Sequence, residues 1–365
     1  MSKNNNKMDI EKKIQLIREV GEEIVTEEEL RKLFETKANP IAYDGFEPSG
    51  KVHIAQGILR AITVNKVTKT GVKFIMLSAD WHAWANNKLS GDLDKIHDCG
   101  SYLIEVWKKS GMDLDKVKFI RSTDLLSKDS YWKTVMQIAR NSTVNRIVRC
   151  AQIMGRKESE SLQASQILYP CMQCADIFEL KCDITQLGMD QRKVNMLARE
   201  IGPKLGFWKP VVVSHHMLMG LGQPVSDEKN AIERAIDLKM SKSKPDSAIF
   251  MTDSIEEVER KIMKAYCPEG QVEENPIIEY CRYILFEKFK EIKIERPSKF
   301  GGDLNIGSFE ELARIYKNKE LHPMDLKQSA AKYINELLEP VRKHFEKNNK
   351  ANELLKKINS YETTR

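Results

Sequence analysis

Long apolar runs are absent from this sequence of 365 residues. No stretch reaches the roughly 18 uncharged apolar residues that a membrane-spanning helix needs, and the first ten residues, MSKNNNKMDI, lack the apolar segment of a secretory signal. We therefore expect neither a membrane partner nor export. Residues 1–8 are polar and rich in asparagine, so they are expected to form a disordered leader.

Cysteine is sparse. The seven cysteines are an odd number and are scattered, so no disulfide framework is expected and the thiols should stay reduced. Cys171 and Cys174 have the C-x-x-C spacing of many zinc sites, but no second pair at ligand spacing accompanies them. The sequence thus predicts a cytoplasmic protein without a bound metal.

A strong charge of one sign is also missing. The 59 Lys and Arg residues against 53 Asp and Glu give a net charge of +6, which permits a polyanionic partner but fits an ordinary mixed-charge surface at least as well. The basic residues nevertheless gather in residues 140–149, 239–244 and 343–365. Such clusters suit contacts with phosphates.

What the chain does have is a regular alternation of short apolar segments and helical periodicity. The strand candidates are Ile41–Gly45, Lys73–Ala79, Val117–Arg121, Cys182–Leu187 and Val211–Ser214. The alternation predicts a Rossmann-type, doubly wound α/β sheet over residues 9–253, whose ligands bind at the carboxyl ends of the strands. The segment Ile10–Phe34 has the spacing of an amphipathic helix, with a break near Gly21.

The alternation stops after Asp253. Helices are expected at Ser254–Tyr266, Pro276–Phe289, Ser308–Lys317 and Pro323–Lys347. Ser254 and Ser308 are each followed three residues later by a glutamate, as in capping boxes. An all-helical second domain is therefore expected over residues 254–365.

Residues 43–57, YDGFEPSGKVHIAQG, leave the first strand, turn at Pro-Ser-Gly and enter a helix. Such a turn exposes backbone N–H groups and the positive end of a helix dipole, and His53 can donate to a phosphate oxygen. The segment is a candidate nucleotide site. Glycines that only permit tight turns, together with a surface histidine, explain it equally well.

Residues 239–245, KMSKSKP, connect the last strand to the helical region. Lys239 and Lys242 are three residues apart among small hydroxyl residues, so the loop could close over a triphosphate and neutralise its charge. A solvated basic linker is the simpler explanation if this loop is considered alone.

Together, the two motifs resemble the paired signature of class I aminoacyl-tRNA synthetases, and the resemblance covers nearly the whole chain. The first signature is usually His-x-Gly-His, whereas this chain has His53, Ala55 and Gln56. The resemblance implies ATP as a substrate, Mg²⁺ as its companion, and catalytic roles for His53, Lys239 and Lys242. The implied ATP-binding residues are Gly45, His53, Gln56, Gly57, Gly188, Asp190, Lys239, Ser241 and Lys242.

Asp190 belongs to the run GMDQRK (residues 188–193), which follows a strand and opens a helix. An acidic side chain there can accept a hydrogen bond from a ribose hydroxyl, and Gly188 lets the nucleoside come close. A helix cap is the alternative role of Asp190, and it is compatible with ribose binding.

A third segment bears on the amino acid. Tyr169, Gln173 and Asp176 are spaced four and three apart in LYPCMQCAD (residues 168–176), so a helix presents them on one face. A carboxylate there can accept a phenol hydrogen bond, and a site so built rejects phenylalanine. A partly solvated polar face explains the spacing equally well.

This segment resembles the tyrosine-binding helix of archaeal and eukaryotic tyrosyl-tRNA synthetases. In that family a strand tyrosine and this aspartate read the phenol, which implies Tyr43 and Asp176 here. The remaining tyrosine-binding residues implied by the resemblance are Leu77, Ala79, His82, Tyr169, Gln173 and Gln191. The tryptophanyl enzymes, the alternative within the class, are not expected to carry the Tyr43 and Asp176 pair.

Residues 298–303 and 320–327 resemble the anticodon-reading segments of the archaeal tyrosyl enzymes. The resemblance implies tRNA(Tyr) binding by Phe300, His322 and Asp325, since an aromatic ring can stack on a splayed base and a carboxylate can accept from guanine. A core phenylalanine and a His-Pro helix start are the alternative. The resemblance also implies a homodimer, and we expect the partner and acceptor-stem contacts in residues 140–149.

An RNA-binding or signalling module that keeps this fold without catalysis is the competing function. The intact set of chemistry-bearing residues weighs against it: Tyr43, Tyr169, Gln173, Asp176, Lys239 and Lys242.

Overall fold

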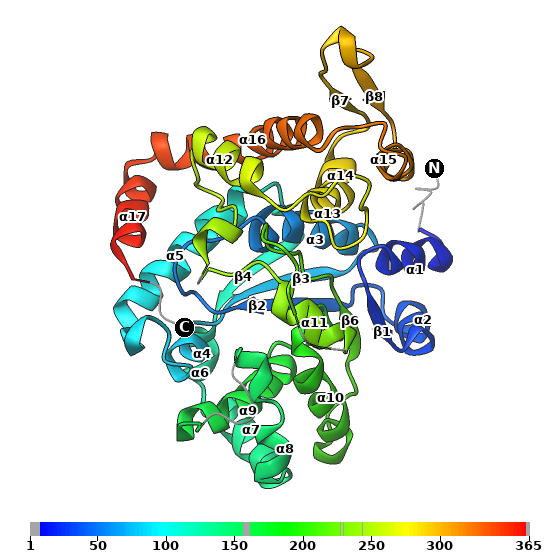
Figure 1. Ribbon diagram of the computed structural model, residues 1–365. Helices are drawn as coiled ribbons and strands as arrows, with labels where there is room; N and C mark the ends of the chain where they lie inside the picture. Colours follow the sequence, from blue (N-terminus) through cyan, green and yellow to red (C-terminus); the bar gives the residue numbers. More distant parts are fainter. Residues whose placement is uncertain (1–7, 156–160, 227, 229, 243, 363–365) are drawn as a thin grey trace, which may run out of the picture.

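A six-stranded sheet crosses the middle of the molecule in the computed structural model, which describes residues 8–155, 161–226, 228, 230–242 and 244–362 (Figure 1). All but Met8 of the expected leader lies outside these residues. The strands are β1 (Glu23–Val25), β2 (Ile41–Phe46), β3 (Lys73–Ser78), β4 (Val117–Arg121), β5 (Ile184–Thr185) and β6 (Val211–Ser214).

The strand order is β1-β6-β5-β2-β3-β4, with β1 antiparallel to β6 and the other pairs parallel. From β2 the chain winds outward through β3 and β4, and then returns to the other side of β2 for β5 and β6. The winding therefore changes direction between β2 and β5. This confirms the predicted doubly wound sheet, and such a change of direction is where these folds bind ligands.

Alternate residues of the central strands face two separate cores. Ala42, Phe74 and Met76 belong to one apolar cluster, whereas Tyr43 and Ile75 belong to the other. This is the two-residue period of a strand that is covered on both faces.

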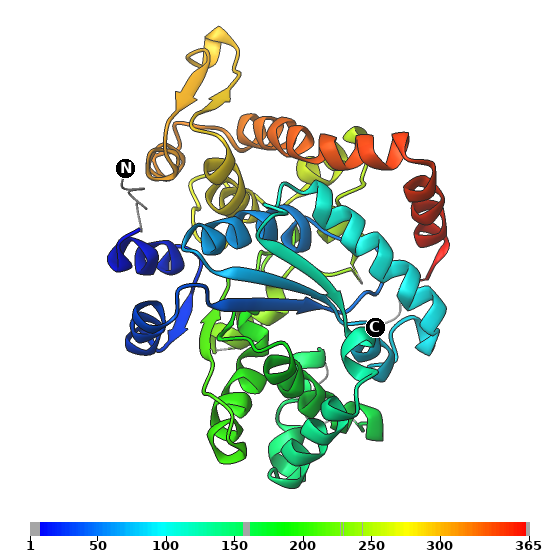
Figure 2. The same ribbon diagram turned by 180° about the vertical axis from the view of Figure 1, so that it is seen from behind.

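Helices cover both faces of the sheet (Figures 1 and 2). On one face lie α3 (Arg60–Lys69), which continues the π-helical turn η1 (Ala55–Leu59), and α5 (Leu93–Lys109). On the other lie α7 (Asp129–Arg140), α8 (Val144–Val148), α9 (Ala164–Glu179) and α10 (Arg192–Ile201). Shorter elements are α4 (Asp80–Ala85), α6 (Ser122–Leu126), η4 (Met189–Gln191) and α11 (Ala231–Leu238).

The helical expectation for Ile10–Phe34 is confirmed on both sides of the break near Gly21, but the edge strand inside that break was not predicted. The segment forms α1 (Ile10–Arg18), the edge strand β1 and α2 (Glu27–Thr36). Gly21 lies where an added Cβ would be 3.0 Å from Val213 Cγ1, so the chain comes close to β6 and pairs with it. A Thr26 capping box then starts α2.

Beyond Asp253 the chain is mostly helical, but the expectation of an all-helical region is wrong because two short strands pair within it. The helices are α12 (Ile255–Lys264), α13 (Pro276–Tyr280) continued through η7 (Cys281–Leu285) into α14 (Phe286–Lys288), α15 (Phe309–Lys317) and α16 (Pro323–Lys347). Ser254 and Ser308 accept hydrogen bonds from the backbone N–H groups of Glu257 and Glu311, as expected of N-caps.

Two features of this region were not predicted. A hairpin of β7 (Ile292–Ile294) and β8 (Leu304–Ile306) projects from the molecule and carries η8 (Ser298–Phe300) at its tip, and α17 (Asn349–Ser360) follows α16 (Figure 1). Strands of three residues are too short for alternation to reveal. The apolar residues of α12–α17 join the core of α3 and α5, so the domain boundary near residue 254 stays a prediction.

None of the helices in the described part of the chain combines the length and the apolar character that a bilayer-spanning segment requires.

Candidate functional site

A cleft of about 1210 Å³ opens at the carboxyl ends of the strands, over the change of winding between β2 and β5. It brings together nearly all the residues that the sequence predicted for tyrosine and ATP. Those that line it are Tyr43, Gly45, His53, Gln56, Leu77, Ala79, His82, Tyr169, Gln173, Asp176, Gly188, Asp190, Gln191, Lys239, Ser241 and Lys242.

Gly57 is the exception among the predicted ATP residues. It lies in η1 and does not belong to the lining, because an added Cβ would stand 2.3 Å from Met251 Sδ. Gly57 therefore has a packing role. Because it has no side chain, η1 can lie close to Met251, in the segment after β6.

The buried end of the cleft holds the carboxylate of Asp176, on α9. Its Oδ2 lies 3.0 Å from His82 Nε2, and its Oδ1 accepts a hydrogen bond from the Tyr131 hydroxyl at 2.9 Å. Burial opposes charge on His82, but Asp176 outweighs it and raises the pKa of the imidazole. This end of the cleft therefore favours the protonated form of His82.

Several buried polar atoms at the same end have no hydrogen-bond partner within the described residues. They include the Tyr43 hydroxyl, Gln173 Oε1 and both ring nitrogens of His82, although His82 Nε2 lies within ion-pair distance of Asp176. Burial, together with the charge of Asp176, raises the pKa of Tyr43 well above its usual value, so the hydroxyl keeps its proton. Buried polar atoms without partners are costly, and here a bound polar ligand would satisfy them.

An amide chain forms one wall. Gln173 Nε2 donates to Gln191 Oε1 at 3.0 Å, and Gln191 Nε2 donates to the Ile153 carbonyl at 3.0 Å. The two bonds set the orientation of both amides, and the Gln173 carbonyl oxygen is left without a partner within the described residues.

The turn after β2 places His53 on the opposite side of the cleft. Gly50 adopts φ of +114°, which suits glycine. The backbone of His53 forms an antiparallel β-bridge with Phe250, which follows the lysine loop, the name used here for residues 239–245. Burial and the charges of Lys242 and Lys239 lower the pKa of His53 well below its ordinary value. His53 is therefore a neutral imidazole that can donate a hydrogen bond.

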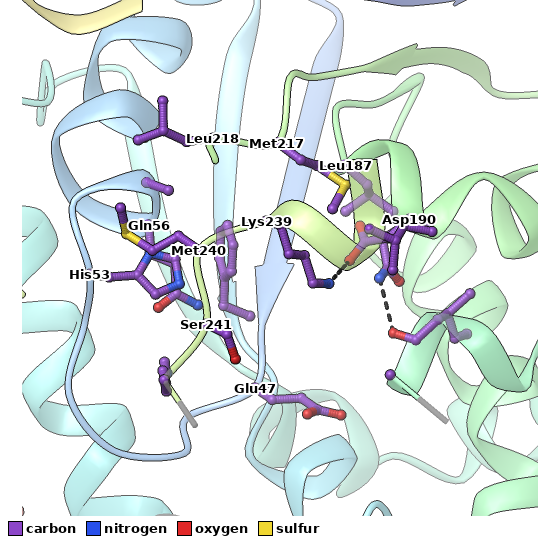
Figure 3. A pocket seen from close by; sticks show the side chains of 18 of the residues that line it. Glu47, His53, Gln56, Leu187, Asp190, Met217, Leu218, Lys239, Met240 and Ser241 are labelled. Atoms are coloured by element: carbon purple, nitrogen blue, oxygen red, sulfur yellow. Dashed lines mark hydrogen bonds and ion pairs between the residues drawn. The ribbon is translucent and has the colours of Figure 1, made fainter. Parts of the chain in front are cut away.

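Asp190 and Lys239 meet across the cleft. Lys239 Nζ lies 2.7 Å from Asp190 Oδ2, and Figure 3 shows the lysine reaching toward the carboxylate. Burial would raise the pKa of Asp190, but Lys239 lowers it below its usual value. An added Cβ at Gly188 would lie 2.6 Å from Asp190 Oδ1, so a side chain at this position would displace the Asp190 carboxylate.

Lys242 comes back from the same loop to the first turn, where its Nζ donates to Ser49 Oγ at 3.3 Å. Burial lowers the pKa of Lys242 to about 8. The two signature motifs are therefore in contact. Ser243, the residue after Lys242, lies outside the described residues.

Sequence reasoning missed Tyr131, Glu47 and the Asp44–Arg60 pair. Glu47 lines the cleft and accepts a hydrogen bond from Asn86 Nδ2 at 3.0 Å. Arg60 Nε lies 2.9 Å from Asp44 Oδ2, and both side chains are buried. Glu47 and Asp44 stood inside the first motif, so their place was available from the sequence. Tyr131 gave no signal, because its partner is distant in the chain.

The two predicted anticodon segments lie together, away from the cleft. Arg296 in the hairpin donates to the Glu320 carbonyl at 2.9 Å, just before α16. His322 is the exposed N-cap of α16, where its Nδ1 accepts from the Met324 N–H, and Asp325 lies in the first turn. Phe300 ends η8 in the hairpin, and its side chain lies outside what the structure describes.

Within the described residues, no group of three or more His, Cys, Asp or Glu side chains is gathered as metal ligands. Cys171 and Cys174 are both buried free thiols on α9.

Comparisons with known proteins agree on one family. The model of the tRNA synthetases class I (W and Y) matches residues 35–339. The chain is 50% identical to tyrosine–tRNA ligase 1, cytoplasmic, of Arabidopsis thaliana, over 98% of this chain and 90% of that one. It is 44% identical to a tyrosine–tRNA ligase of Saccharolobus islandicus, over 96% and 98% of the two chains.

Solved structures agree with the sequences. A Leishmania major tyrosyl-tRNA synthetase in complex with tyrosinol superimposes with a TM-score of 0.88 at 44% identity, over 98% of this chain and 61% of that one. A Pyrococcus horikoshii tyrosyl-tRNA synthetase complexed with L-tyrosine gives 0.88 at 39% identity, over 96% and 100%. The chain belongs to the class I tRNA synthetases (W and Y), within their tyrosyl-tRNA synthetase branch.

Proposed function

We propose that the cleft between β2 and β5 is the active site of a tyrosine–tRNA ligase, with His53, Lys239 and Lys242 as its catalytic residues. As a tyrosyl-tRNA synthetase, the chain activates L-tyrosine with ATP to tyrosyl-adenylate and transfers the tyrosyl group to the 3′ end of tRNA(Tyr). The observation that carries the site assignment is the buried Asp176 carboxylate beside the unpartnered Tyr43 hydroxyl.

The Tyr43 and Asp176 pair suits a phenol. A phenol hydroxyl can donate to Asp176 and accept from Tyr43, whereas a phenyl ring would leave the Tyr43 hydroxyl unpaired and would give Asp176 no hydrogen bond from the ligand. Leu77, Ala79 and His82 form the wall around the ring. The ammonium and carboxylate of the amino acid are bound by three further polar residues of the lining, Tyr169, Gln173 and Gln191.

ATP occupies the other part of the cleft. Its ribose hydroxyls bind Asp190 next to Gly188, and its phosphates lie among His53, Gln56, Ser241 and the two lysines. The tyrosine carboxylate oxygen attacks the α-phosphorus, the bond from that phosphorus to the bridging oxygen breaks, and pyrophosphate leaves. No side chain forms a covalent bond.

The chain's own groups stabilise charge in this step. The neutral imidazole of His53 donates to a phosphate oxygen, and the Lys239 and Lys242 ammonium groups neutralise charge that develops on the pyrophosphate. Mg²⁺, carried by the triphosphate, would add charge neutralisation. The Glu47 carboxylate, which also lines the cleft, is an oxygen donor of the kind that this ion prefers.

Recognition of tRNA(Tyr) uses the far end of the molecule. The hairpin and the start of α16, joined by Arg296 and Glu320, present Phe300, His322 and Asp325 for the anticodon. Stacking on Phe300 and a hydrogen bond from guanine to Asp325 would read single-stranded bases.

A homodimer and a cytoplasmic location complete the proposal. Apolar side chains are exposed on the neighbouring helices α7, α8 and α9: Trp132 at 38%, Met136 at 61%, Val144 at 65% and Leu168 at 38%. Large apolar side chains gathered in this way favour a protein interface. Val144 lies within the basic residues 140–149, and the other three lie before or after them; we assign this segment to partner and acceptor-stem contacts. The cytoplasm is also the place named for the Arabidopsis relative.

Amino-acid-dependent exchange of pyrophosphate into ATP tests the activity. Exchange is expected with tyrosine and not with phenylalanine or tryptophan. Exchange with tryptophan alone would contradict the tyrosine assignment, and no exchange with any amino acid would favour the non-catalytic RNA-binding module.

A further inference from the structure

Tyr131 is a buried side chain that contacts Asp176 without lining the cleft. It comes from α7, which packs against α9, and its ring meets Trp132 edge to face at 5.8 Å. The Tyr131 oxygen lies 2.9 Å from Asp176 Oδ1 and 3.1 Å from the Met172 carbonyl. One hydroxyl hydrogen serves one acceptor best, and a carboxylate is the stronger acceptor.

The Asp176 carboxylate needs partners to hold its direction. The last torsion of an aspartate side chain has broad, soft minima, so hydrogen bonds decide where the two oxygens point. In this structure each oxygen has one neighbour: Tyr131 on Oδ1 and His82 near Oδ2. A carboxylate has about four acceptor sites, so a substrate phenol can still bind.

We propose that Tyr131 is a positioning residue for amino-acid selection: its hydroxyl fixes the Asp176 carboxylate in the direction that accepts a phenol. Tyr131 does not touch the amino acid, and it acts through Asp176. The proposal rests on the proposed tyrosine site and adds to it a determinant outside the cleft.

The consequence is specific to the substrate hydroxyl. Without the Tyr131 hydroxyl the Asp176 carboxylate turns more freely, and the hydrogen bond to a bound phenol is weakened. Phenylalanine makes no such bond, so its use should not change. A purely structural role for Tyr131 would instead affect both amino acids equally.

Tyr131→Phe is the direct test, because it keeps the ring and removes only the hydroxyl. Pyrophosphate exchange is measured with tyrosine and with phenylalanine at high concentration, and kcat/KM is compared. We expect a fall of about tenfold for tyrosine, in keeping with the loss of a hydrogen bond to a charged group, and no fall for phenylalanine. If kcat/KM falls equally for tyrosine and phenylalanine, or does not fall for either, the proposal is overturned.

Tyr316→Phe is the matched control. It removes another fully buried tyrosine hydroxyl, which donates to the Pro268 carbonyl at 2.9 Å in the helical region. In this variant the ratio of kcat/KM for tyrosine to kcat/KM for phenylalanine should match that of the unaltered protein. If the unaltered protein shows no preference for tyrosine, the proposed function fails, and that outcome is distinct from failure of the Tyr131 proposal.

A double-mutant cycle tests the route through Asp176. In an Asp176→Asn background, Tyr131→Phe should change the ratio of kcat/KM for tyrosine to kcat/KM for phenylalanine by less than twofold. The reason is that the group that Tyr131 positions is already altered. An undiminished effect overturns the route. Should Tyr131→Phe not fold, Tyr131→Leu also removes the donor, and the same loss of preference is expected.

Discussion

Lys239 Nζ and Asp190 Oδ2 are 2.7 Å apart, so one lysine of the second signature motif is already paired with the carboxylate assigned to the ribose. The pair ties the loop to the segment after β5, on the far side of the cleft from His53 (Figure 3). Ribose and phosphate binding are thereby linked, because a change at either residue leaves the other with an unpaired charge.

Lys239→Met is expected to lower kcat/KM for ATP by about 10²–10³-fold, since a group that stabilises transition-state charge is lost. The pKa of Asp190 should also rise, because Lys239 is what lowers it. Pyrophosphate exchange at varied ATP measures the first effect. Lys264→Met, an exposed lysine on α12, is the control and should leave kcat/KM unchanged. If the Lys239→Met and Asp190→Asn effects simply add, the two residues are not coupled as argued.

Lys242 should give the activation step an upper pH limit. Burial lowers the pKa of this lysine to about 8, so its ammonium is present at pH 7 and is lost as pH rises through 8. Above that pH, kcat/KM for ATP is expected to fall by about tenfold per pH unit, because this parameter reports the free enzyme.

Two variants of Lys242 check the assignment. Lys242→Arg keeps its charge at all these pH values, so the alkaline fall should disappear. Lys242→Ala should cut the activation rate at pH 7 and leave tyrosine binding, measured by calorimetry without ATP, nearly intact. Parallel loss of rate and of tyrosine affinity would contradict a role for the loop in phosphate chemistry.

Much of the site was readable from sequence because it is built from local motifs. The Pro-Ser-Gly turn, the lysine loop and the face of α9 each bring their residues into the cleft by short-range geometry, and the strand pattern supplied the edge on which they meet. Gly57 shows the limit, because a glycine inside a motif was assigned to ATP although Met251, far along the chain, explains it.

The remaining features depend on contacts between distant segments. The short strand β1 exists because β6 offers an edge beside Gly21, and a helical spacing in the sequence could not reveal that. Tyr131 looks like any apolar position of α7 until α9 is packed against it. Pairs of this kind have no fixed spacing, so periodicity and motif rules do not detect them.

His216 is another such distant contact, and it should make stability depend on pH. Its Nδ1 faces Glu22, its Nε2 lies 2.8 Å from Glu279 Oε1, and its ring stacks on Tyr283 at 4.0 Å. Burial opposes its charge, but the two carboxylates prevail and raise the pKa of His216 to about 9. Because the pKa of His216 is higher in the folded state than in the unfolded chain, protonation of His216 stabilises the folded state. This contribution is complete below pH 6.5, the ordinary pKa of histidine, and is lost as pH rises through 9.

His216→Gln should therefore lower the free energy of unfolding at pH 6 by about 1–3 kcal/mol, the usual effect of losing hydrogen bonds to charged groups. The difference from the unaltered protein should shrink at pH 10, where His216 is neutral. Urea denaturation at the two pH values measures it. If the variant and the unaltered protein differ equally in free energy of unfolding at pH 6 and at pH 10, the charge of His216 does not contribute to stability.

The exposed apolar side chains of α7 and α8 provide the test of the proposed homodimer. Met136 and Val144 are the most exposed of the group, and Trp132 lies one helical turn before Met136, on the same face. A charge buried at an interface is costly, so Met136→Glu combined with Val144→Glu should break the association. Sedimentation at micromolar concentration should give the mass of one chain, 42.0 kDa.

Leu114→Glu is the matched control. Leu114 is a large apolar residue, as Met136 is, and its side chain is 48% exposed, but it lies on the loop before β4. It should leave the dimer intact. If the double variant keeps the mass of the unaltered protein, the interface lies elsewhere on the surface. If the unaltered protein is itself a single chain at this concentration, the proposed homodimer is wrong, and the apolar side chains of α7 and α8 need another partner.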